Sequence, residues 1–457
     1  MKNAVIAQSG GPTAVINNSL RGVINVLKDS GQVGKIFGAR MGILGVLKEE
    51  LLDITDQDAK QIALLGKTPS AGVFGSCRYK IKSREDLDRI VDVFTRHDVG
   101  YFFYCGGNDS MDTADKISRL AKDRGLDLTC AGIVKTIDND VGGGLLPDGT
   151  FDICDHNPGY GSTARSTAIN ILEANEENKA SHTSDPVLVI GVMGRKIGFI
   201  AASARLADPD RRIPLVIVLP EAFNQAAAEE NLSYITEQVN KKLQESGRCV
   251  VVVSEGVNLG DLDILRDSFG HEQFSASGRG AEQVLANYLN GLDRKDGSGR
   301  AQSRLSVPGI ARYERPGTRQ RREFATVSEV DLAEAYQVGA YAAKLVLKGE
   351  SGFMSTIRRL AGIASQEETG GLISTIKKIA GVRKYEVVYE TVPLNVVANA
   401  DRKFPIEWIT PDRIDVTDAY IKWAQPLLGR PLPVMAEFEE TYEPKICPAY
   451  VPQAQRK

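Results

Sequence analysis

The chain has 457 residues, of which 25% are charged and 42% hydrophobic, which is the usual composition of a soluble globular protein. At about 150 residues per domain, this length predicts two or three domains. The net charge of −3 excludes a basic field of the kind that attracts nucleic acid. No apolar run approaches the ~18 residues of a membrane helix, and the N-terminus lacks the apolar region of a signal peptide. Six scattered cysteines predict reduced thiols in a cytoplasmic protein.

Short apolar strands alternate with amphipathic helices along most of the chain. Helices between consecutive strands are typical of parallel sheets, so the pattern predicts an α/β fold with two similar halves. Open sheets of this kind bind ligands beyond the carboxyl ends of their strands, where polar turns follow the apolar runs here. The expected strands are 3–8, 33–39, 99–105, 128–134, 187–192, 215–219 and 249–253, and the expected helices are 14–28, 86–97, 111–121, 161–178, a segment ending near 206, and 226–244.

Two of these strand ends carry a glycine pair in front of a helix. Ser9-Gly10-Gly11 follows the first strand, and bare amides at a helix N-terminus can bind phosphate. A tight strand-to-helix turn explains the same residues equally well. Gly106-Gly107-Asn108-Asp109-Ser110 repeats the arrangement and adds a carboxylate. Asp109 can hold Mg²⁺, or either Asn108 or Asp109 can cap the following helix.

The segment Lys135-Thr136-Ile137-Asp138-Asn139-Asp140 concentrates reactive groups at one strand end. In phosphoryl transfer the acceptor hydroxyl needs a base, the metal ion needs an anion, and the moving phosphoryl group needs a cation. All three kinds of group occur within these six residues. A solvated turn is the alternative interpretation.

Two strand ends in the second half carry further charges, in Met193-Gly194-Arg195 and Ser254-Glu255-Gly256. The paired donors of arginine suit a phosphate or a developing negative charge. Glu255 suits a sugar hydroxyl, and Arg312 and Arg321, in the basic section 292–322, suit a sugar phosphate. A surface ion pair explains each residue alone better, but five such strand ends together indicate one shared site.

Six motifs stand in order along the chain: SGGPTAVIN (9–17), GSCR (75–78), GGNDS, KTIDND, MGR and SEG. With this order and spacing, residues 1–350 resemble the phosphofructokinases, and within them the pyrophosphate-dependent branch. The resemblance implies two three-layer domains with mostly parallel sheets and an active site in the cleft between them. The implied domains are a phosphoryl-donor domain at 1–150 plus roughly 322–400, a fructose 6-phosphate domain at 151–321, and a C-terminal extension at 401–457 that packs on the core.

The resemblance also implies a reaction, the reversible transfer of a phosphoryl group from pyrophosphate to the 1-hydroxyl of fructose 6-phosphate, with Mg²⁺ as cofactor. Asp138 would be the base that takes the hydroxyl proton. The other implied catalytic residues are Lys135, Thr136, Asp140 and Arg195. The implied pyrophosphate site is Gly10, Gly11, Arg78, Asp109 and Lys135, the metal site is Asn108 and Asp109, and the sugar-phosphate site is Thr136, Asp138, Met193, Gly194, Arg195, Glu255, Arg312, Thr318 and Arg321.

The choice of donor depends on two positions. ATP users in the family typically carry glycine where this chain has Asp109 and Lys135. A carboxylate at position 109 fills space and adds negative charge where the α-phosphate of a nucleotide would lie. Lys135 supplies a cation beside the transferring phosphoryl group. Both exchanges favour pyrophosphate.

The chain departs from the family pattern at three positions near the substrates. Asn108 replaces the first of two usual aspartates, and an amide is a weaker Mg²⁺ ligand. Thr318 stands where His or Tyr is usual, and Pro186 where many relatives have an arginine that reaches a neighbouring subunit. Arg312 matches a second arginine that a neighbouring subunit often contributes, and we expect a homodimer or homotetramer.

Two other functions are weighed against this one. Asp109 and Lys135 disfavour an ATP-dependent phosphofructokinase. The intact set Lys135, Asp138, Asp140, Arg195 and Glu255 disfavours a catalytically silent subunit that only binds sugar phosphate. Neither nucleic acid nor a membrane is an expected partner, since phosphate binding explains the arginine-rich section 292–322.

Overall fold

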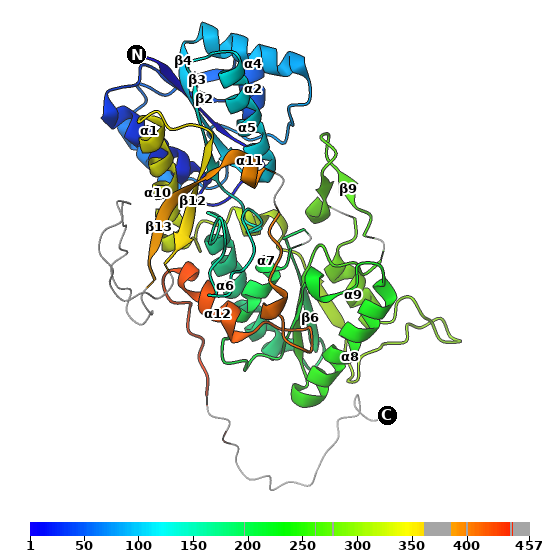
Figure 1. The fold of residues 1–457 in the computed structure, drawn as a ribbon. Coiled ribbons are helices and arrows are strands. Elements are labelled where there is room, and N and C mark those ends of the chain that lie inside the picture. Colours follow the sequence, from blue (N-terminus) through cyan, green and yellow to red (C-terminus); the bar gives the residue numbers. More distant parts are fainter. Residues whose placement is uncertain are drawn as a thin grey trace.

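The computed structural model describes residues 1–195, 197–260, 262–276, 278–360, 385–398, 401–438 and 441. Two lobes lie one above the other (Figure 1). The upper lobe is built on a seven-stranded sheet in the order β13-β12-β5-β4-β1-β2-β3. Its inner strands are parallel, and the edge strands β3 and β13 are antiparallel to their neighbours. The strands are β1 (Asn3–Gln8), β2 (Ile36–Ala39), β3 (Leu51–Asp53), β4 (Val99–Gly106), β5 (Thr129–Val134), β12 (Phe353–Arg359) and β13 (Val387–Pro393).

The lower lobe is built on a four-stranded parallel sheet in the order β11-β6-β8-β7. A short antiparallel hairpin, β9 with β10, projects from this lobe toward the upper one (Figure 1). The strands are β6 (Val187–Val192), β7 (Leu215–Val218), β8 (Cys249–Ser254), β9 (Leu265–Arg266), β10 (Glu272–Gln273) and β11 (Ala311–Glu314).

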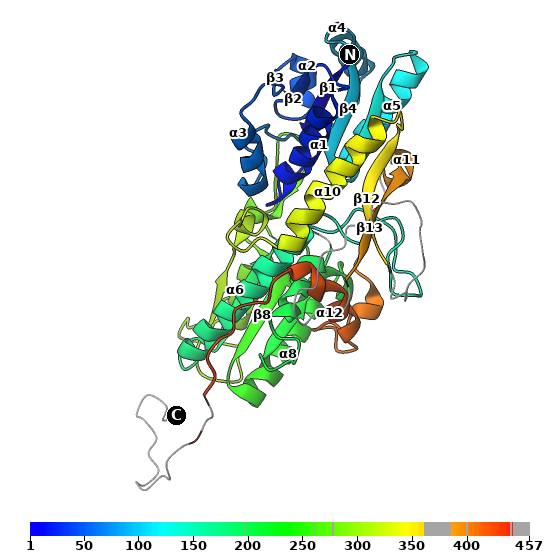
Figure 2. The same cartoon turned by 90° about the vertical axis from the view of Figure 1, so that its left-hand side faces the viewer.

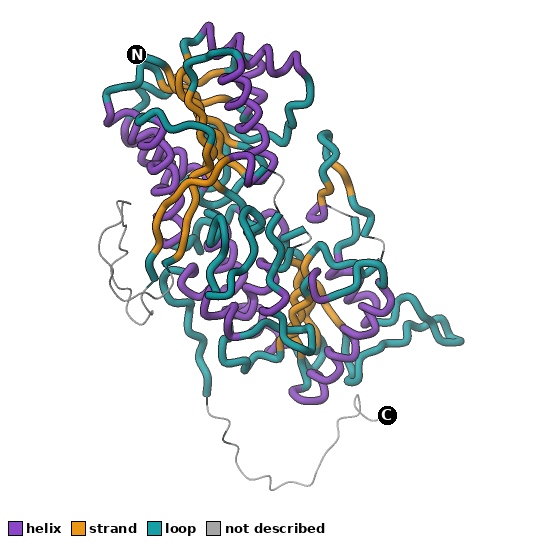
Figure 3. The backbone as a smooth tube through the Cα atoms, viewed as in Figure 1, coloured by secondary structure: helices purple, strands orange, loops and turns teal. Residues whose placement is uncertain are grey.

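Helices flank the strands on both sides in each lobe, which makes each a three-layer unit and confirms the expected fold class (Figure 3). The α-helices are α1 (Ile16–Ser30), α2 (Ile43–Lys48), α3 (Ala59–Leu64), α4 (Arg84–Arg96), α5 (Asn108–Asp123), α6 (Tyr160–Ser181), α7 (Phe199–Ala202), α8 (Ala228–Ser246), α9 (Ala281–Leu289), α10 (Glu329–Val346), α11 (Leu394–Val397) and α12 (Asp418–Ala424). The 3-10 helices are Leu65–Lys67, Ser203–Ala207, Pro220–Ala222, Phe274–Ala276, Gly317–Arg321, Ile406–Trp408 and Gln425–Leu428.

Helix α10 returns the chain from the lower lobe to the upper one and lies along α1 (Figure 2). Gly22 of α1 and Gly339 of α10 allow this close approach, because a Cβ atom at either position would overlap the backbone of the facing helix. Apolar residues of both helices belong to the core cluster that covers the first sheet. The return explains why strands from residues 3–134 and 353–393 share one sheet.

The described part of the C-terminal segment packs on the lower lobe. Trp408, Tyr420 and Trp423 belong to one buried cluster with Phe151 and Phe199, within aromatic contact distance of one another. The aromatic side chains thus tie this segment to the core. The exact bounds of the three sequence-predicted domains stay a prediction, and most of the extension beyond residue 438 lies outside the described residues.

The structure bears on two expectations drawn from the composition, those about cysteines and about membrane helices. The cysteines at 77, 105, 130, 154 and 249 are buried and unpaired, as expected, and Cys447 lies outside the described residues. No helix in the described part of the chain is long and apolar enough to span a bilayer.

Candidate active site

A cavity of about 360 Å³ lies where strand ends of the two sheets meet. Turns after β1, β4 and β5 line it from the upper lobe, and turns after β6 and β8 from the lower lobe. The five polar strand ends singled out in the sequence therefore share one space. The sequence-predicted residues in its lining are Gly10, Gly11, Arg78, Asn108, Asp109, Lys135, Thr136, Asp138, Asp140, Met193, Arg195, Glu255 and Arg321.

Three cations surround the glycine turn after β1. Lys135 is buried, and its Nζ donates to the carbonyl of Gly11 at 2.6 Å. A Cβ atom on Gly11 would lie 3.5 Å from Arg321 Nη1 and 3.7 Å from Arg78 Nη2, so a side chain there would enter the space between the guanidinium groups. Gly10 adopts a φ of +76°, a left-handed conformation that glycine adopts without strain. This arrangement of bare backbone and cations is chemically suited to an anion.

Burial changes the titration of these cations. It lowers the pKa of Lys135 to about 8, because the low-dielectric interior disfavours the charged form. Burial likewise lowers the pKa of Arg78 and of Arg321, although arginine stays protonated at any physiological pH. Lys135 is thus the one of these three whose charge can change near neutral pH.

The loop after β5 presents Asp138 and Asp140 to the cavity on either side of Asn139. Asn139 has a φ of +57°, and its Oδ1 accepts a hydrogen bond from the Asn157 backbone at 2.9 Å, which fixes this left-handed turn. Asp138 N–H donates to Thr136 Oγ1 at 3.1 Å. Burial raises the pKa of Asp138 to about 7, and the negative charges of Asp140 and Glu255 add to the shift. A carboxylate with this pKa is a suitable general base near neutral pH.

The lower lobe contributes a turn that backbone hydrogen bonds hold in place. Met193 N–H donates to Gln320 Oε1 at 2.8 Å, and Arg195 N–H donates to Glu255 Oε1 at 3.1 Å. Gly194 forms the bend with a φ of +126° and does not itself line the cavity. Burial raises the pKa of Glu255 to about 7. This arrangement directs one guanidinium and one carboxyl group toward the same space.

Two predicted sugar-phosphate residues lie outside this cavity. Arg312 on β11 pairs with Asp185 at 2.9 Å, and Thr318 is exposed in the 3-10 helix Gly317–Arg321. Of the eight arginines between 294 and 322, all of them described, Arg321 alone lines the cavity. Phosphate binding therefore fails to explain the section as a whole. Four of its arginines form ion pairs instead, Arg304 with Asp293, Arg312 with Asp185, Arg315 with Glu282 and Arg319 with Glu323.

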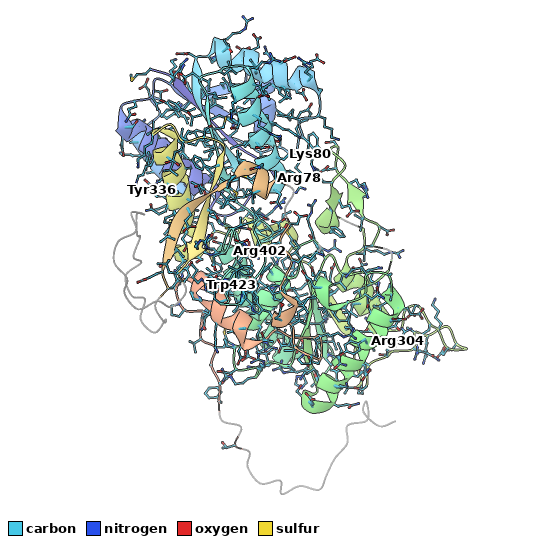
Figure 4. The ribbon with its side chains drawn as sticks, in the orientation of Figure 1. Arg78, Lys80, Arg304, Tyr336, Arg402 and Trp423 are labelled. Carbon is cyan, nitrogen blue, oxygen red and sulfur yellow. The ribbon has the colours of Figure 1, made fainter. Side chains whose placement is uncertain are left out.

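The cavity also has lining residues that the sequence patterns did not single out. Lys80, close to Arg78 in the chain and labelled with it in Figure 4, has its Nζ 2.8 Å from Asp109 Oδ1. His271 comes from the β9–β10 hairpin, and Asp401 from the C-terminal segment. Lys80 could have been found from the sequence, because it lies two residues after the GSCR motif. His271 and Asp401 gave no such signal, because neither follows an apolar strand. The remaining such residues are Tyr79, Glu272 and Phe274, whereas Ser9, Pro12, Gly107, Ser110 and Ile137 belong to the sequence motifs without an assigned role.

The residues predicted to hold Mg²⁺ supply oxygen atoms, which this ion prefers. Asn108 Oδ1 is buried and without a hydrogen-bond partner, while its Nδ2 donates to Asp401 Oδ1 at 2.6 Å. An unpaired acceptor on a residue that lines a polar cavity fits a cation. No cluster of three or more His, Cys, Asp or Glu side chains arranged for a metal occurs in the described part of the chain. Mg²⁺ here would therefore take further ligands from a bound phosphate and water.

Comparison with known proteins gives a consistent result. The phosphofructokinase family model matches residues 3–309. The pyrophosphate–fructose 6-phosphate 1-phosphotransferases of Halomonas elongata and Methylococcus capsulatus are 34% and 35% identical to this chain, over 93% of it and 91% of each relative. The crystal structure of a pyrophosphate-dependent phosphofructokinase from Marinobacter aquaeolei matches with a TM-score of 0.74 and 33% identity, covering 96% of this chain and 94% of that one.

Proposed function

Because this chain belongs to the phosphofructokinase family, we propose that it transfers a phosphoryl group reversibly from pyrophosphate to the 1-hydroxyl of fructose 6-phosphate. The products are fructose 1,6-bisphosphate and phosphate. The substrates are those in the names of the relatives it matches over most of its length. The observation that carries the choice of donor is the buried ammonium of Lys135, held by the Gly11 carbonyl in the lining that also contains Asp138.

Asp138 starts the transfer. Its carboxylate accepts the proton of the sugar 1-hydroxyl as that oxygen forms its bond to a pyrophosphate phosphorus. The bond from this phosphorus to the bridging oxygen breaks, and phosphate leaves with the electron pair. In the reverse direction, protonated Asp138 returns the proton to the sugar oxygen. A pKa of about 7 suits a group that serves as base in one direction and acid in the other.

The cations around the glycine turn act on the phosphoryl group. Lys135, Arg78 and Arg321 converge on Gly10 and Gly11, so their charges stand where negative charge spreads over the phosphoryl oxygens. Asp109 lines the same cavity, paired with Lys80, and its carboxylate would repel the additional phosphate of a nucleotide. Thr136 and Asp140 support the base from the same loop.

Mg²⁺ completes the proposed donor site, with Asn108 and Asp109 as its protein ligands. When bound, the ion would neutralise part of the pyrophosphate charge. The free Oδ1 of Asn108 supports this placement.

The sugar phosphate would bind between the lobes, with Met193, Arg195, Glu255 and Arg321 around it. We further propose that the active form is a homo-oligomer in which Arg312 of one subunit serves the site of another. In support, Arg312 is exposed at the edge strand of the second sheet and lies away from the cavity of its own chain. Thr318 is exposed as well and also lies outside the cavity of its own chain.

A steady-state assay with two donors tests the proposal. The purified chain, with fructose 6-phosphate and Mg²⁺, should turn over with pyrophosphate and far more slowly with ATP. Preference for ATP would make the chain an ATP-dependent phosphofructokinase. No turnover with either donor, combined with binding of sugar phosphate, would identify a silent subunit.

A further inference from the structure

The segment 401–438 reaches back to the loop that carries Asp138 and Asp140. Arg402 N–H donates to the carbonyl of Asp140 at 2.8 Å, and Asp401 forms an antiparallel bridge with Val141. The segment therefore continues the backbone pairing of the loop that carries Asp138. Figure 4 places Arg402 in the centre of the molecule, between the two lobes.

Arg402 anchors this contact. Its side chain is 2% exposed and its guanidinium lies 4.2 Å from the ring centre of Phe151. Gly142 leaves room for it, because a Cβ atom there would overlap the guanidinium. The guanidinium donates to three backbone carbonyls, those of Val141, Cys154 and Asp155. Because a buried arginine cannot shift without losing these hydrogen bonds, the position of its neighbour Asp401 is fixed as well.

Asp401 in turn fixes the side-chain amide of Asn108. Asn108 Nδ2 donates to Asp401 Oδ1 at 2.6 Å, and the two residues lie 293 positions apart in the chain. A primary amide has donors on one side and an acceptor on the other, so this bond turns Oδ1 away from Asp401. That oxygen is the buried atom without a partner. Without an acceptor at 401, the amide could rotate and present N–H groups, which repel a cation.

We propose that Asp401 is a positioning residue of the donor site: it orients the Asn108 amide with its oxygen toward Mg²⁺-bound pyrophosphate and supplies the negative charge that an asparagine lacks. The inference rests on the proposed function, since it assumes that donor. Asn108 stands where the family usually has an aspartate, and the carboxylate of Asp401 thereby replaces the missing negative charge. Groups that orient metal ligands typically contribute about 10–100-fold to metal affinity.

The experiment measures binding without turnover. The full-length chain is titrated with a Mn²⁺–pyrophosphate complex in the absence of sugar, and the water-proton relaxation rate reports the bound ion. Asp401→Ala should weaken binding about 10–100-fold. Lys403→Ala, which removes an exposed neighbouring charge outside the cavity lining, should change the affinity less than about twofold. Because Asp401 is exposed, its truncation should leave the thermal midpoint unchanged.

Repeating the titration in an Asn108→Asp variant distinguishes orientation of the Asn108 amide from a merely structural role of Asp401. A carboxylate at 108 presents an oxygen in either orientation, so in Asn108→Asp the loss of Asp401 should cost no affinity. Equal losses in both backgrounds, or no loss with Asn108 intact, would overturn the inference while leaving the proposed function standing. Failure of the unmodified chain to bind the complex would instead overturn the proposed function, and the inference with it.

Discussion

The two sides of the cavity are built in different ways. On the donor side Lys135 is buried and bonded to the Gly11 carbonyl, so its cation is in place before any ligand arrives. On the sugar side the Met193–Arg195 turn is held through its backbone, and Arg195 is exposed. Two further residues expected on that side, Arg312 and Thr318, lie outside the cavity.

The difference follows from what each side would bind. Pyrophosphate offers only charged oxygens, so its recognition relies on fixed charges that need no reorganisation during the reaction. A sugar phosphate offers hydroxyl groups and a larger surface, which side chains can meet on arrival. Substitutions on the donor side should therefore lower turnover, and substitutions on the sugar side should mainly raise the KM for fructose 6-phosphate.

The largest effect is expected at Asp138, where the two sides meet. Asp138→Asn keeps the shape of the side chain and removes the base, so kcat should fall about 10²–10⁴-fold. The KM for each substrate should change little. Asp148→Asn, which alters an exposed carboxylate in the following loop, is the matched control. Near-normal turnover of Asp138→Asn in the steady-state assay would exclude this residue as the base.

The donor side is tested by the double variant Asp109→Gly with Lys135→Gly. Removing the Lys135 cation should lower kcat with pyrophosphate about 10²–10³-fold, and removing the Asp109 carboxylate should allow ATP to be used. The measurement is the ratio of kcat/KM for the two donors. Unchanged pyrophosphate turnover together with no ATP turnover would contradict the account of donor choice.

Arg321 tests how the donor side and the sugar side divide the cavity. It lies near Gly11 on the donor side, yet it is predicted to bind the sugar phosphate. Arg321→Ala should raise the KM for fructose 6-phosphate roughly 10–100-fold, as expected for loss of hydrogen bonds to a charged group. Arg319→Ala, which removes an exposed ion pair two residues away, should change it less than about twofold. A rise in the KM for pyrophosphate alone would assign Arg321 to the donor side.

The smallest effect is the pH dependence of the forward reaction. Asp138 acts as a base only when deprotonated, so kcat/KM should rise with pH up to its pKa of about 7. Lys135 loses its charge as the pH passes its pKa of about 8, so kcat/KM should fall above that value, roughly tenfold per unit. Lys135→Arg keeps the charge and should move the alkaline limb upward. An alkaline limb that stays near 8 in this variant would belong to another group.

Much of the fold follows from the sequence, because buried parallel strands leave continuous apolar runs. The expected helices 86–97 and 226–244 correspond to α4 and α8 within two residues at each end. The edge strands β3 and β13 were not expected, since a strand paired on one side needs no such run. The segment ending near 206 divides into α7 and the 3-10 helix Ser203–Ala207 rather than one helix.

The candidate site was predictable where chemistry follows a strand. Asp138, Arg195 and Glu255 come directly after β5, β6 and β8, and the structure brings all three to one cavity. His271 and Asp401 could not be found this way, because tertiary packing alone carries the hairpin and the C-terminal segment to the cavity. The ion pairs of Arg312 with Asp185 and of Arg315 with Glu282 could not be found this way either, because these partners lie far apart in the chain, whereas Arg319 and Glu323 are only four residues apart.

The buried anchor at Arg402 has a consequence for the order in which the protein matures. During synthesis the loop with Asp138 leaves the ribosome more than 260 residues before Arg402 does. Until then the carbonyls of Val141, Cys154 and Asp155 lack the guanidinium that they accept from in the finished structure. Both sheets can form earlier, but a nascent chain that stops short of residue 402 should have an unfinished donor loop, so phosphoryl transfer should begin only after Arg402 has been added and has folded back onto this loop.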